Sequence, residues 1–477
     1  MPFLGHRGRW LIAGALAALV PAIFMWGFTV DDALISVRYA RHLSSGVGWR
    51  FDAGGPPTDG VTPLPWVPML VPLARGGALA VLGAAKTLGL LLWGATGCAL
   101  GGAMGAMPRA PAWARAAALA TLALSVPAAA YAVSGMETAV ATALATAAVL
   151  LGRRVLLAAL IAGCAAAFRS EMGLWAFVLA VGFALAARAR PGRVLGAGLV
   201  AVTPFLACAV VRTAVWGHPA PLALLAKPSD LAHGAAYAGA ACVVTLVPLL
   251  VLAPLALRRA PLAMVAVVAG VAHVVAMVGV GGDWMPYARL MVPVLPSLAW
   301  AAALASEHAH PVATAVRSTA ALGLGVVLVA TGGTEGRHVG RDRAALVEAA
   351  RPRLAGFRRV ASLDVGWVSA ATEADIVDLA GVTDPGIAAL PGGHTSKRID
   401  ARLLLERGTD ALLLYAPSGL PGESPEAWRE ASYGRTVEAR LAADDVTARH
   451  FAAVAFLPLG ARGAGYVLLR ALPSDGP

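Results

Sequence analysis

Residues 31–66, DDALISVRYARHLSSGVGWRFDAGGPPTDGVTPLPW, follow the first long apolar run of the chain. The stretch begins with two adjacent carboxylates, Asp31 and Asp32, continues as a basic amphipathic segment and ends in a loop rich in glycine, proline and aspartate. Charged side chains at the edge of a bilayer are costly in free energy, and they commonly mark functional positions. The stretch therefore predicts a polar functional segment directly beside a membrane helix.

The composition of the 477-residue chain is that of a polytopic membrane protein. Hydrophobic residues make up 58% of it and charged residues 14%, whereas a soluble domain carries about 25% charged residues. The net charge of +11 comes mainly from arginines scattered between apolar runs. Nucleic-acid binding is a poor explanation of this charge, because it requires basic residues gathered on one patch. The four cysteines lie within apolar runs and show no disulfide or zinc spacing.

Eleven apolar runs approach the roughly 20 residues that a spanning helix needs. The first follows the basic sequence HRGRW, and no small-residue cleavage site comes after it, so we expect an uncleaved first helix. A further run, 62–74, is short and contains four prolines, which suits an interfacial or re-entrant segment. The eleven runs are 10–29, 79–106, 116–132, 136–152, 154–168, 171–187, 194–215, 235–257, 261–280, 287–305 and 313–331.

Clusters of arginine orient these runs, because cytoplasmic loops are enriched in Lys and Arg. If each cluster is cytoplasmic, the chain crosses twice between successive clusters, and the count closes only if 62–74 does not cross. This predicts eleven spans with the N-terminus inside and the C-terminus outside, and Arg75 as a minor exception. The clusters are His6–Arg9, Arg109/Arg115, Arg153/Arg154, Arg188–Arg193 and Arg258/Arg259.

The composition changes after the last run. ADIVDLAG and DALLLYAP are typical of buried strands, and FAAVAFLPLG with GAGYVLLRAL is typical of a terminal hairpin. We therefore expect an α-helical transmembrane domain over 1–335, with a first outer loop at 30–78. Residues 336–477 should form an outward-facing α/β domain.

The first outer loop offers candidate residues with two readings each. Asp31 and Asp32 could cap the amphipathic segment 33–43, or one of them could accept a proton from a hydroxyl as a partly desolvated base. The segment has the pattern of a helix lying in the membrane interface. Arg38 and Arg41 would then attract an anionic headgroup, or extend to bulk phospholipid.

Three further outer turns carry polar residues. Ser134 and Glu137 fit a capping box, although a cap can also line a cavity. Arg169 could pair with Glu171 or hold a phosphate in bidentate geometry. The loop 281–289, GGDWMPYAR, has two glycines that permit close backbone approach, and its polar side chains resemble part of a binding site.

Taken together, these motifs resemble one group of GT-C membrane glycosyltransferases. The group is typified by the terminal arabinofuranosyltransferase of arabinan-containing bacterial cell walls, and some of its members are described as flagellar motor control proteins. The resemblance is carried, in unbroken order, by DDALISVRYARHL, DGVTPLPW, SGMETA, FRSE, GGDWMPYARLMVPVLP, VDLAGVTDP and GGH.

The resemblance implies a GT-C fold in the bacterial cytoplasmic membrane, with an outward active site. The donor would be a polyprenyl-phosphate sugar, and the acceptor an envelope glycan or glycolipid. An acid in the first outer loop would act as general base in an inverting displacement. The positions that match the family's motifs are Asp31 and Asp32 as the paired acids, and Arg38, Tyr39, Glu137, Arg169, Glu171, Lys227, Asp283, Arg289, Asp384 and His394 around the substrates.

Departures from the family pattern leave the sugar open. Leu222 and Ala223 stand where the family usually has Asn-Thr, and Ser170 stands where it has Pro. No cofactor is required by the implied mechanism, although paired carboxylates could hold Mg²⁺ through water. Two alternatives from other classes are a lipid transporter, which would favour inverted repeats that the sequence does not display, and a non-enzymatic membrane assembly or motor-control factor.

Overall fold

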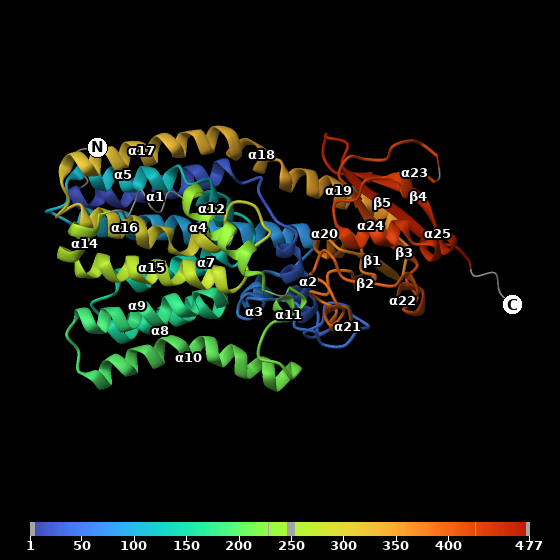
Figure 1. Cartoon of the computed structure of the whole chain (residues 1–477), viewed down its shortest axis with the longest axis horizontal. Helices are drawn as coiled ribbons and strands as arrows, with labels where there is room; N and C mark the ends of the chain where they lie inside the picture. The colour runs from blue at the N-terminus through green and yellow to red at the C-terminus, as the bar shows by residue number, and fades with distance from the viewer. Residues whose placement is uncertain (1–4, 228, 246–252, 425, 474–477) are drawn as a thin grey trace.

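Helices form over all eleven apolar runs in the residues that the computed structural model describes, which are 5–227, 229–245, 253–424 and 426–473. Part of the run 235–257 lies outside these residues. Figure 1 shows the helices side by side in a bundle. They are α1 (His6–Phe24), α4 (Ala78–Gly105), α5 (Ala112–Ala123), α6 (Val126–Ala132), α7 (Thr138–Leu150), α8 (Val155–Phe168), α9 (Gly173–Ala186), α10 (Pro191–Trp216), α12 (Leu231–Val244), α14 (Pro254–Arg259), α15 (Pro261–Gly279), α16 (Leu295–Ala305) and α17 (Pro311–Leu328).

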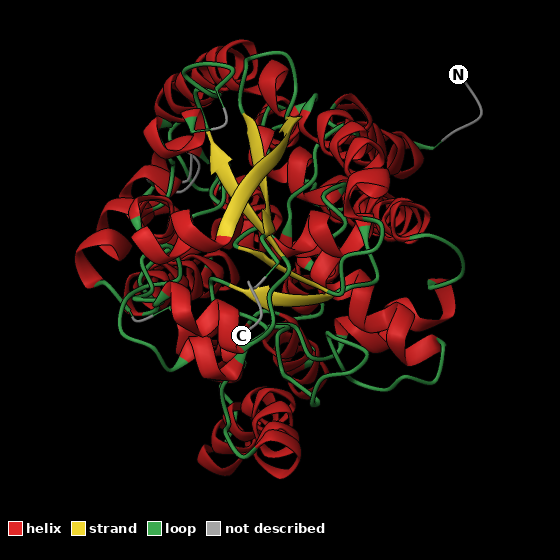
Figure 2. Ribbon diagram, turned by 90° about the vertical axis from the view of Figure 1, so that its right-hand side faces the viewer, coloured by secondary structure: helices red, strands yellow, loops and turns green. Residues whose placement is uncertain are grey.

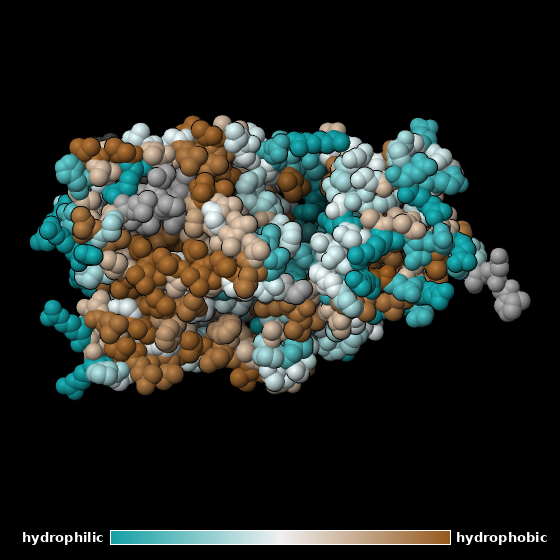
Figure 3. Space-filling view, in the orientation of Figure 1, coloured by the Kyte–Doolittle hydropathy of each residue, from teal (hydrophilic) through white to brown (hydrophobic). Residues whose placement is uncertain are grey.

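The lengths of these helices support a helical membrane protein. Five described helices are long and apolar enough to cross a bilayer, or six if the pair α5 and α6, bent by 60°, counts as one span. On the face shown in Figure 3, apolar side chains predominate along the middle of the bundle, and polar ones gather at its left end and over the sheet domain. Helices such as α7, with 13 residues, reach only about 20 Å, which is less than the hydrocarbon core. Eleven crossings therefore remain a prediction.

Small residues allow the first two long helices to pack closely. A Cβ atom on Gly14 of α1 would lie 2.0 Å from the carbonyl oxygen of Gly97 on α4, and one on Gly101 would lie 2.1 Å from that of Trp10. Such close backbone contact is typical of helix pairs in membranes, where packing and not water exclusion holds helices together.

The first loop agrees with the expectation in its closing run and differs from it in its amphipathic segment. As expected, the run 62–74 is too short to cross, because it forms only α3 (Trp66–Leu70) and the 3₁₀ turn η1 (Val71–Leu73). Helix α2 (Asp32–Ser44) does not lie exposed in a membrane interface, because most of it is buried. Arg38 is only 1% exposed, so the prediction that it faces lipid is wrong.

The C-terminal part contains the predicted strands and hairpin in one five-stranded sheet (Figure 2). The strand order is β2-β1-β3-β5-β4, with β1, β2 and β3 parallel and the last three strands antiparallel. The elements are α19 (Val339–Leu354), β1 (Arg359–Ser362), α20 (Val365–Ala371), β2 (Asp375–Asp378), α21 (Pro385–Ala388), α22 (Ala401–Glu406), β3 (Ala411–Ala416), α23 (Ala427–Glu430), α24 (Thr436–Ala443), α25 (Asp445–His450), β4 (Phe451–Pro458) and β5 (Gly465–Ala471).

A long helical segment, with a turn at Arg337 and His338, joins the bundle to this sheet domain. It runs from Pro311 to Leu354, 44 residues, through α17, the π-helical turn η4 (Val329–Gly333), α18 (Thr334–Gly336) and α19. Figure 1 shows it passing along one edge of the molecule from bundle to sheet. The expected domain boundary at 335/336 therefore falls inside a helix and not in a linker.

Candidate functional site

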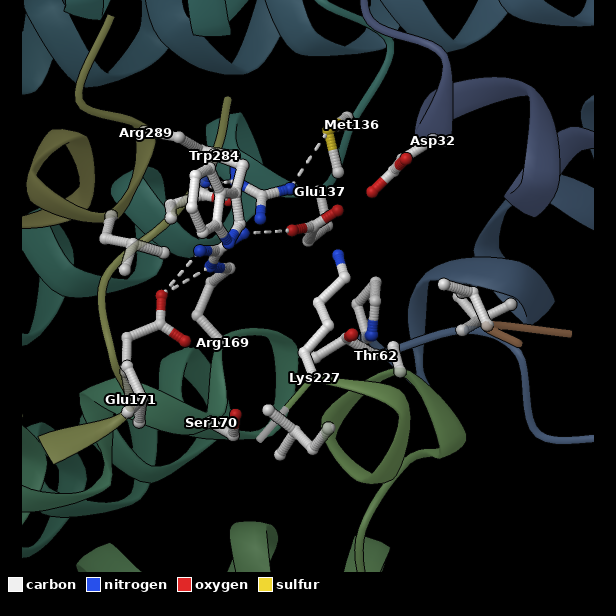
Figure 4. Close-up of a pocket in the computed structure, with 18 of the residues that line it drawn as sticks. Asp32, Thr62, Met136, Glu137, Arg169, Ser170, Glu171, Lys227, Trp284 and Arg289 are labelled. Carbon is white, nitrogen blue, oxygen red and sulfur yellow. Dashed lines mark hydrogen bonds and ion pairs between the residues drawn. The ribbon is translucent and has the colours of Figure 1, made fainter. Parts of the chain in front are cut away.

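A cavity lies where the helical bundle meets the sheet domain (Figure 4). Its polar lining comes from six segments far apart in the sequence. They are the start of α2, residues 60–63 of the first loop, the turn before α7, the turn η2 (Ser170–Met172) after α8, the end of the short helix α11 (Leu222–Ala226), and the loop after α15. Seven of the predicted site residues are brought together there, namely Asp32, Glu137, Arg169, Glu171, Lys227, Asp283 and Arg289.

Arg169 is held between two carboxylates. Its Nη1 lies 2.8 Å from Glu137 Oε1, and its Nη2 lies 2.6 Å from Glu171 Oε1. All three side chains are buried. The pairing of Arg169 with Glu171 is therefore formed, whereas the capping box of Ser134 and Glu137 is not, because the Glu137 carboxylate turns to the arginine.

The second arginine is fixed by its own loop. Arg289 Nε lies 2.8 Å from Asp283 Oδ2. Burial raises the pKa of the Asp283 carboxyl, but Arg289 and Lys227 outweigh burial, and the pKa lies below its usual value. The backbone before Arg289 is in the left-handed region at Tyr287 (φ 61°) and Ala288 (φ 47°), an uncommon conformation for residues with side chains. This turn aims the guanidinium into the cavity.

The predicted close backbone approach occurs at the two glycines of the same loop. Both have positive φ, 85° at Gly281 and 74° at Gly282. A Cβ on Gly281 would lie 2.7 Å from the backbone nitrogen of Asp230. The glycines therefore allow the loop to lie against the start of α12.

Three side chains reach into the cavity with polar atoms that no group of the described residues satisfies. Among the described residues, neither the Asp32 carboxylate nor the Lys227 ammonium makes a hydrogen bond or an ion pair, and Glu137 Oε2 is buried without a hydrogen-bond partner. Figure 4 shows the ends of these three side chains pointing toward one another across the cavity. They are available to a bound molecule, in contrast to the two arginines.

Asp31 has a different role from its neighbour. Its carboxylate accepts hydrogen bonds from the backbone N–H groups of Gly366 (2.7 Å) and Trp367 (2.9 Å), at the start of α20. Arg343 Nε lies 3.7 Å away. Burial raises the pKa of Asp31 to about 6, and Arg343 lowers it in part. The carboxylate thus caps a helix of the sheet domain, and Asp32 is the acid that lines the first cavity.

Arg38 and Tyr39 lie outside this cavity and hold the first loop in place. Arg38 donates to the carbonyl oxygens of Phe51 (2.6 Å) and Ala374 (2.8 Å), and so joins the loop to the sheet domain. The Tyr39 hydroxyl lies 2.6 Å from Thr58 Oγ1 and accepts the N–H of Gly60. Because Gly60 lines the cavity, both residues act on its shape from a distance.

A second cavity lies between α2 and the sheet domain, and His394 belongs to it. Trp284, His394, Asp364 and Arg435 are among its lining residues. Asp364 and Arg435, which form an ion pair of 2.8 Å, were not predicted as site residues. A signal for Asp364 was present, because it comes just after β1, and the carboxyl ends of parallel strands commonly carry binding residues. Asp384 pairs instead with Arg407 and caps α21.

No protein-family model, curated protein or solved structure matches the chain. Within the described residues, no three His, Cys, Asp or Glu side chains are grouped as a metal site. The described chain is thus a helical membrane protein with a sheet domain and a charged cavity between the two.

Proposed function

We propose that the chain is an inverting glycosyltransferase of the bacterial cytoplasmic membrane. It would transfer a sugar, in the first instance a pentofuranose, from a polyprenyl-phosphate donor to a cell-envelope glycan or glycolipid. The observation that carries the proposal is the unpaired Asp32 carboxylate facing the unpaired Lys227 ammonium. A base and an unneutralised cation across one cavity suit a displacement with an anionic leaving group.

The proposed step is a single displacement at the anomeric carbon. Asp32 accepts the proton of an acceptor hydroxyl, whose oxygen forms the new bond to the anomeric carbon. The bond from that carbon to the phosphate oxygen breaks, and the lipid phosphate leaves with the electron pair. Lys227 is the cation that meets the phosphate, because the charges of Arg169 and Arg289 are already matched by carboxylates. Those two arginines form part of the cavity wall, and their ion pairs fix the shape of the wall and the directions in which its N–H groups point.

The formal charges of the cavity favour this assignment of roles. Four carboxylates (Asp32, Glu137, Glu171 and Asp283) face three cations (Arg169, Lys227 and Arg289). When Asp32 takes up the proton, the cavity loses one negative charge as the departing phosphate gains one. The transition state therefore develops no additional net charge in a partly buried site, where charge is costly.

The two neighbouring aspartates provide the test and its matched control. In the full chain reconstituted into lipid nanodiscs, Asp32→Asn should lower transfer from a polyprenyl-phosphate pentofuranose to a linear arabino-oligosaccharide by at least about 100-fold, the size of a general-base contribution. Asp31→Asn should keep most of the rate, because Asn retains an oxygen that can accept from the α20 backbone. The readout is incorporation of radiolabelled sugar.

Two results would contradict the proposal. One is a native rate in Asp32→Asn. The other is the absence of transfer by the native chain with polyprenyl-phosphate pentose and hexose donors alike. In that second case, movement of the labelled lipid between vesicle leaflets would favour a lipid transporter, and its absence would favour an assembly factor.

A further inference from the structure

The second cavity meets the first at the proposed base. It is formed by Asp31, Asp32, Lys227 and Trp284 on the side of the bundle, and by residues such as Asp364, His394 and Arg435 on the side of the sheet domain. Asp32, Lys227, Asp283 and Trp284 line both cavities. A molecule in either cavity would therefore reach the same carboxylate.

The charges of the two cavities differ. Five carboxylates of the second cavity (Asp31, Asp32, Asp283, Asp364 and Asp378) face only two cations, Lys227 and Arg435. The first cavity has four carboxylates against three cations. An anionic phosphate is therefore disfavoured in the second cavity relative to the first, whereas a neutral molecule rich in hydroxyl groups would find many acceptors there.

Trp284 gives this cavity an apolar wall. The residue is 64% exposed. One face of its indole stacks on the His233 ring, with centroids 4.1 Å apart and planes at 9°, and His394 lies 5.7 Å away at 58°. The indole thus packs against two histidines while much of its surface stays open. An aromatic side chain that lines a cavity together with a few polar groups is typical of a ligand site.

Polar groups line the cavity together with the indole. Arg435 is one of them, and its Nη1 is buried without a hydrogen bond, 3.7 Å from Glu438 Oε2. Burial lowers the pKa of His394 to about 3, with Lys227 adding to the effect, so its imidazole is neutral at physiological pH and can both donate and accept. A sugar ring has an apolar C–H face and a rim of hydroxyls, and this wall offers a surface for each.

We propose that the second cavity binds the glycan acceptor, with one sugar ring stacked on the Trp284 indole and its hydroxyls at the surrounding polar groups. This inference rests on the proposed function and adds to it the site and the class of the acceptor. The glycan lies on the side of the sheet domain, and the charged donor occupies the first cavity. The two substrates meet at Asp32.

The test measures glycan binding without any donor. The full native chain in nanodiscs is titrated with a linear arabinopentaose and, separately, a linear mannopentaose by calorimetry. We expect one of them to bind, Trp284→Ala to weaken that binding at least tenfold, and Trp284→Phe to keep it within about threefold. Trp113→Ala is the matched control, because Trp113 is also an exposed tryptophan, 44% exposed, at the start of α5 away from both cavities; it should bind as the native chain does. Thermal unfolding checks that the variants are folded.

The results separate the two proposals. Binding that depends on Trp284, in a chain that transfers no sugar, would support the glycan cavity and overturn the proposed catalysis. Transfer with an acceptor KM unchanged by Trp284→Ala would overturn the cavity assignment alone, and Trp284 would then be an interfacial anchor. Failure of both pentasaccharides to bind the native chain would also overturn it. In an active enzyme, Trp284→Ala should raise the acceptor KM at least tenfold and the donor KM by a smaller factor, because Trp284 lines both cavities.

Discussion

Asp31 and Asp32 are chemically identical neighbours, and only their surroundings in the folded chain distinguish them. The partners of Asp31, the N–H groups of Gly366 and Trp367, lie 335 and 336 residues further along the chain. No local pattern can indicate such a contact. The sequence could therefore predict that the pair matters, but not which carboxylate remains open to the cavity.

Residues at turns of the bundle were more accessible to prediction. Glu137, Arg169 and Asp283 interrupt long apolar runs, and a charged residue there must find a polar environment. Arg38 also interrupts a partly apolar segment, but its partners are mainly backbone carbonyls of the first loop and the sheet domain. Backbone acceptors leave no trace in the sequence, so its structural role could not be foreseen.

The cluster around Arg169 should be essential for stability. Arg169→Met would leave Glu137 and Glu171 as buried carboxylates without their counterion, at a cost of about 3–5 kcal/mol in the free energy of unfolding. We expect a clear fall in Tm in nanodiscs. Glu137→Gln and Glu171→Gln added to Arg169→Met should restore part of it, since the buried charges are then gone. A Tm of Arg169→Met equal to that of the native chain would contradict this assignment.

At the scale of single elements, strands and helices followed from local patterns, whereas their exposure did not. The apolar segments that form β2 and β3 are buried over most of their length, as continuous apolar runs in a parallel sheet require. Helix α2 has the amphipathic pattern of a surface helix, yet α20 and α4 cover it. Burial of α2 depends on the arrival of the sheet domain, which no pattern within α2 encodes.

One contact between elements should make the stability of the sheet domain depend on pH. Glu438 of α24 accepts the N–H of Tyr415 on β3 at Oε1, and its Oε2 is buried without a hydrogen-bond partner. Burial raises the pKa of Glu438 to about 8, although Arg435 lowers it in part. The folded chain thus holds a proton that the unfolded chain releases above about pH 4.5.

The sign of the effect follows from this difference in proton binding. The contribution of Glu438 to stability is complete below pH 4.5, declines as pH rises, and is lost as pH passes about 8. The total is about 5 kcal/mol. Glu438→Gln should remove this part of the pH dependence of Tm between pH 5 and 9. Glu348→Gln, at an exposed position of α19, is the control and should change nothing. An identical pH profile for Glu438→Gln and the native chain would contradict the assignment.

At the scale of the whole molecule, the sequence predicted a helical membrane part followed by a mixed α/β part, and the structure contains both. The two parts differ so much in composition that errors in predicting single elements do not change this division. The number of crossings was harder to predict, because apolar runs of 13–17 residues are compatible with a short span, a broken span or a buried helix. The helix lengths in the structure are compatible with the same three alternatives.

The predicted topology can be tested with single cysteines. Cysteines placed at Arg75 and Gly463 should react with a membrane-impermeant maleimide in intact cells, whereas those at Arg153 and Arg190 should react only after permeabilisation. All four positions are exposed. The native cysteines lie within apolar helices, so the native chain serves as the background control. Labelling of Arg190→Cys from outside, or none of Gly463→Cys, would overturn the proposed orientation.

The helix from Pro311 to Leu354 has a consequence for how this molecule tolerates change. At about 1.5 Å and 100° for each residue, its 44 residues fix both the height of the sheet domain and the direction in which that domain faces. Its π-helical turn, Val329–Gly333, accommodates one residue more than a regular α-helix would. Deleting a single residue there would turn the sheet domain about the helix axis as well as lower it. The number of residues in this helix therefore sets the angle of the sheet domain about the helix axis.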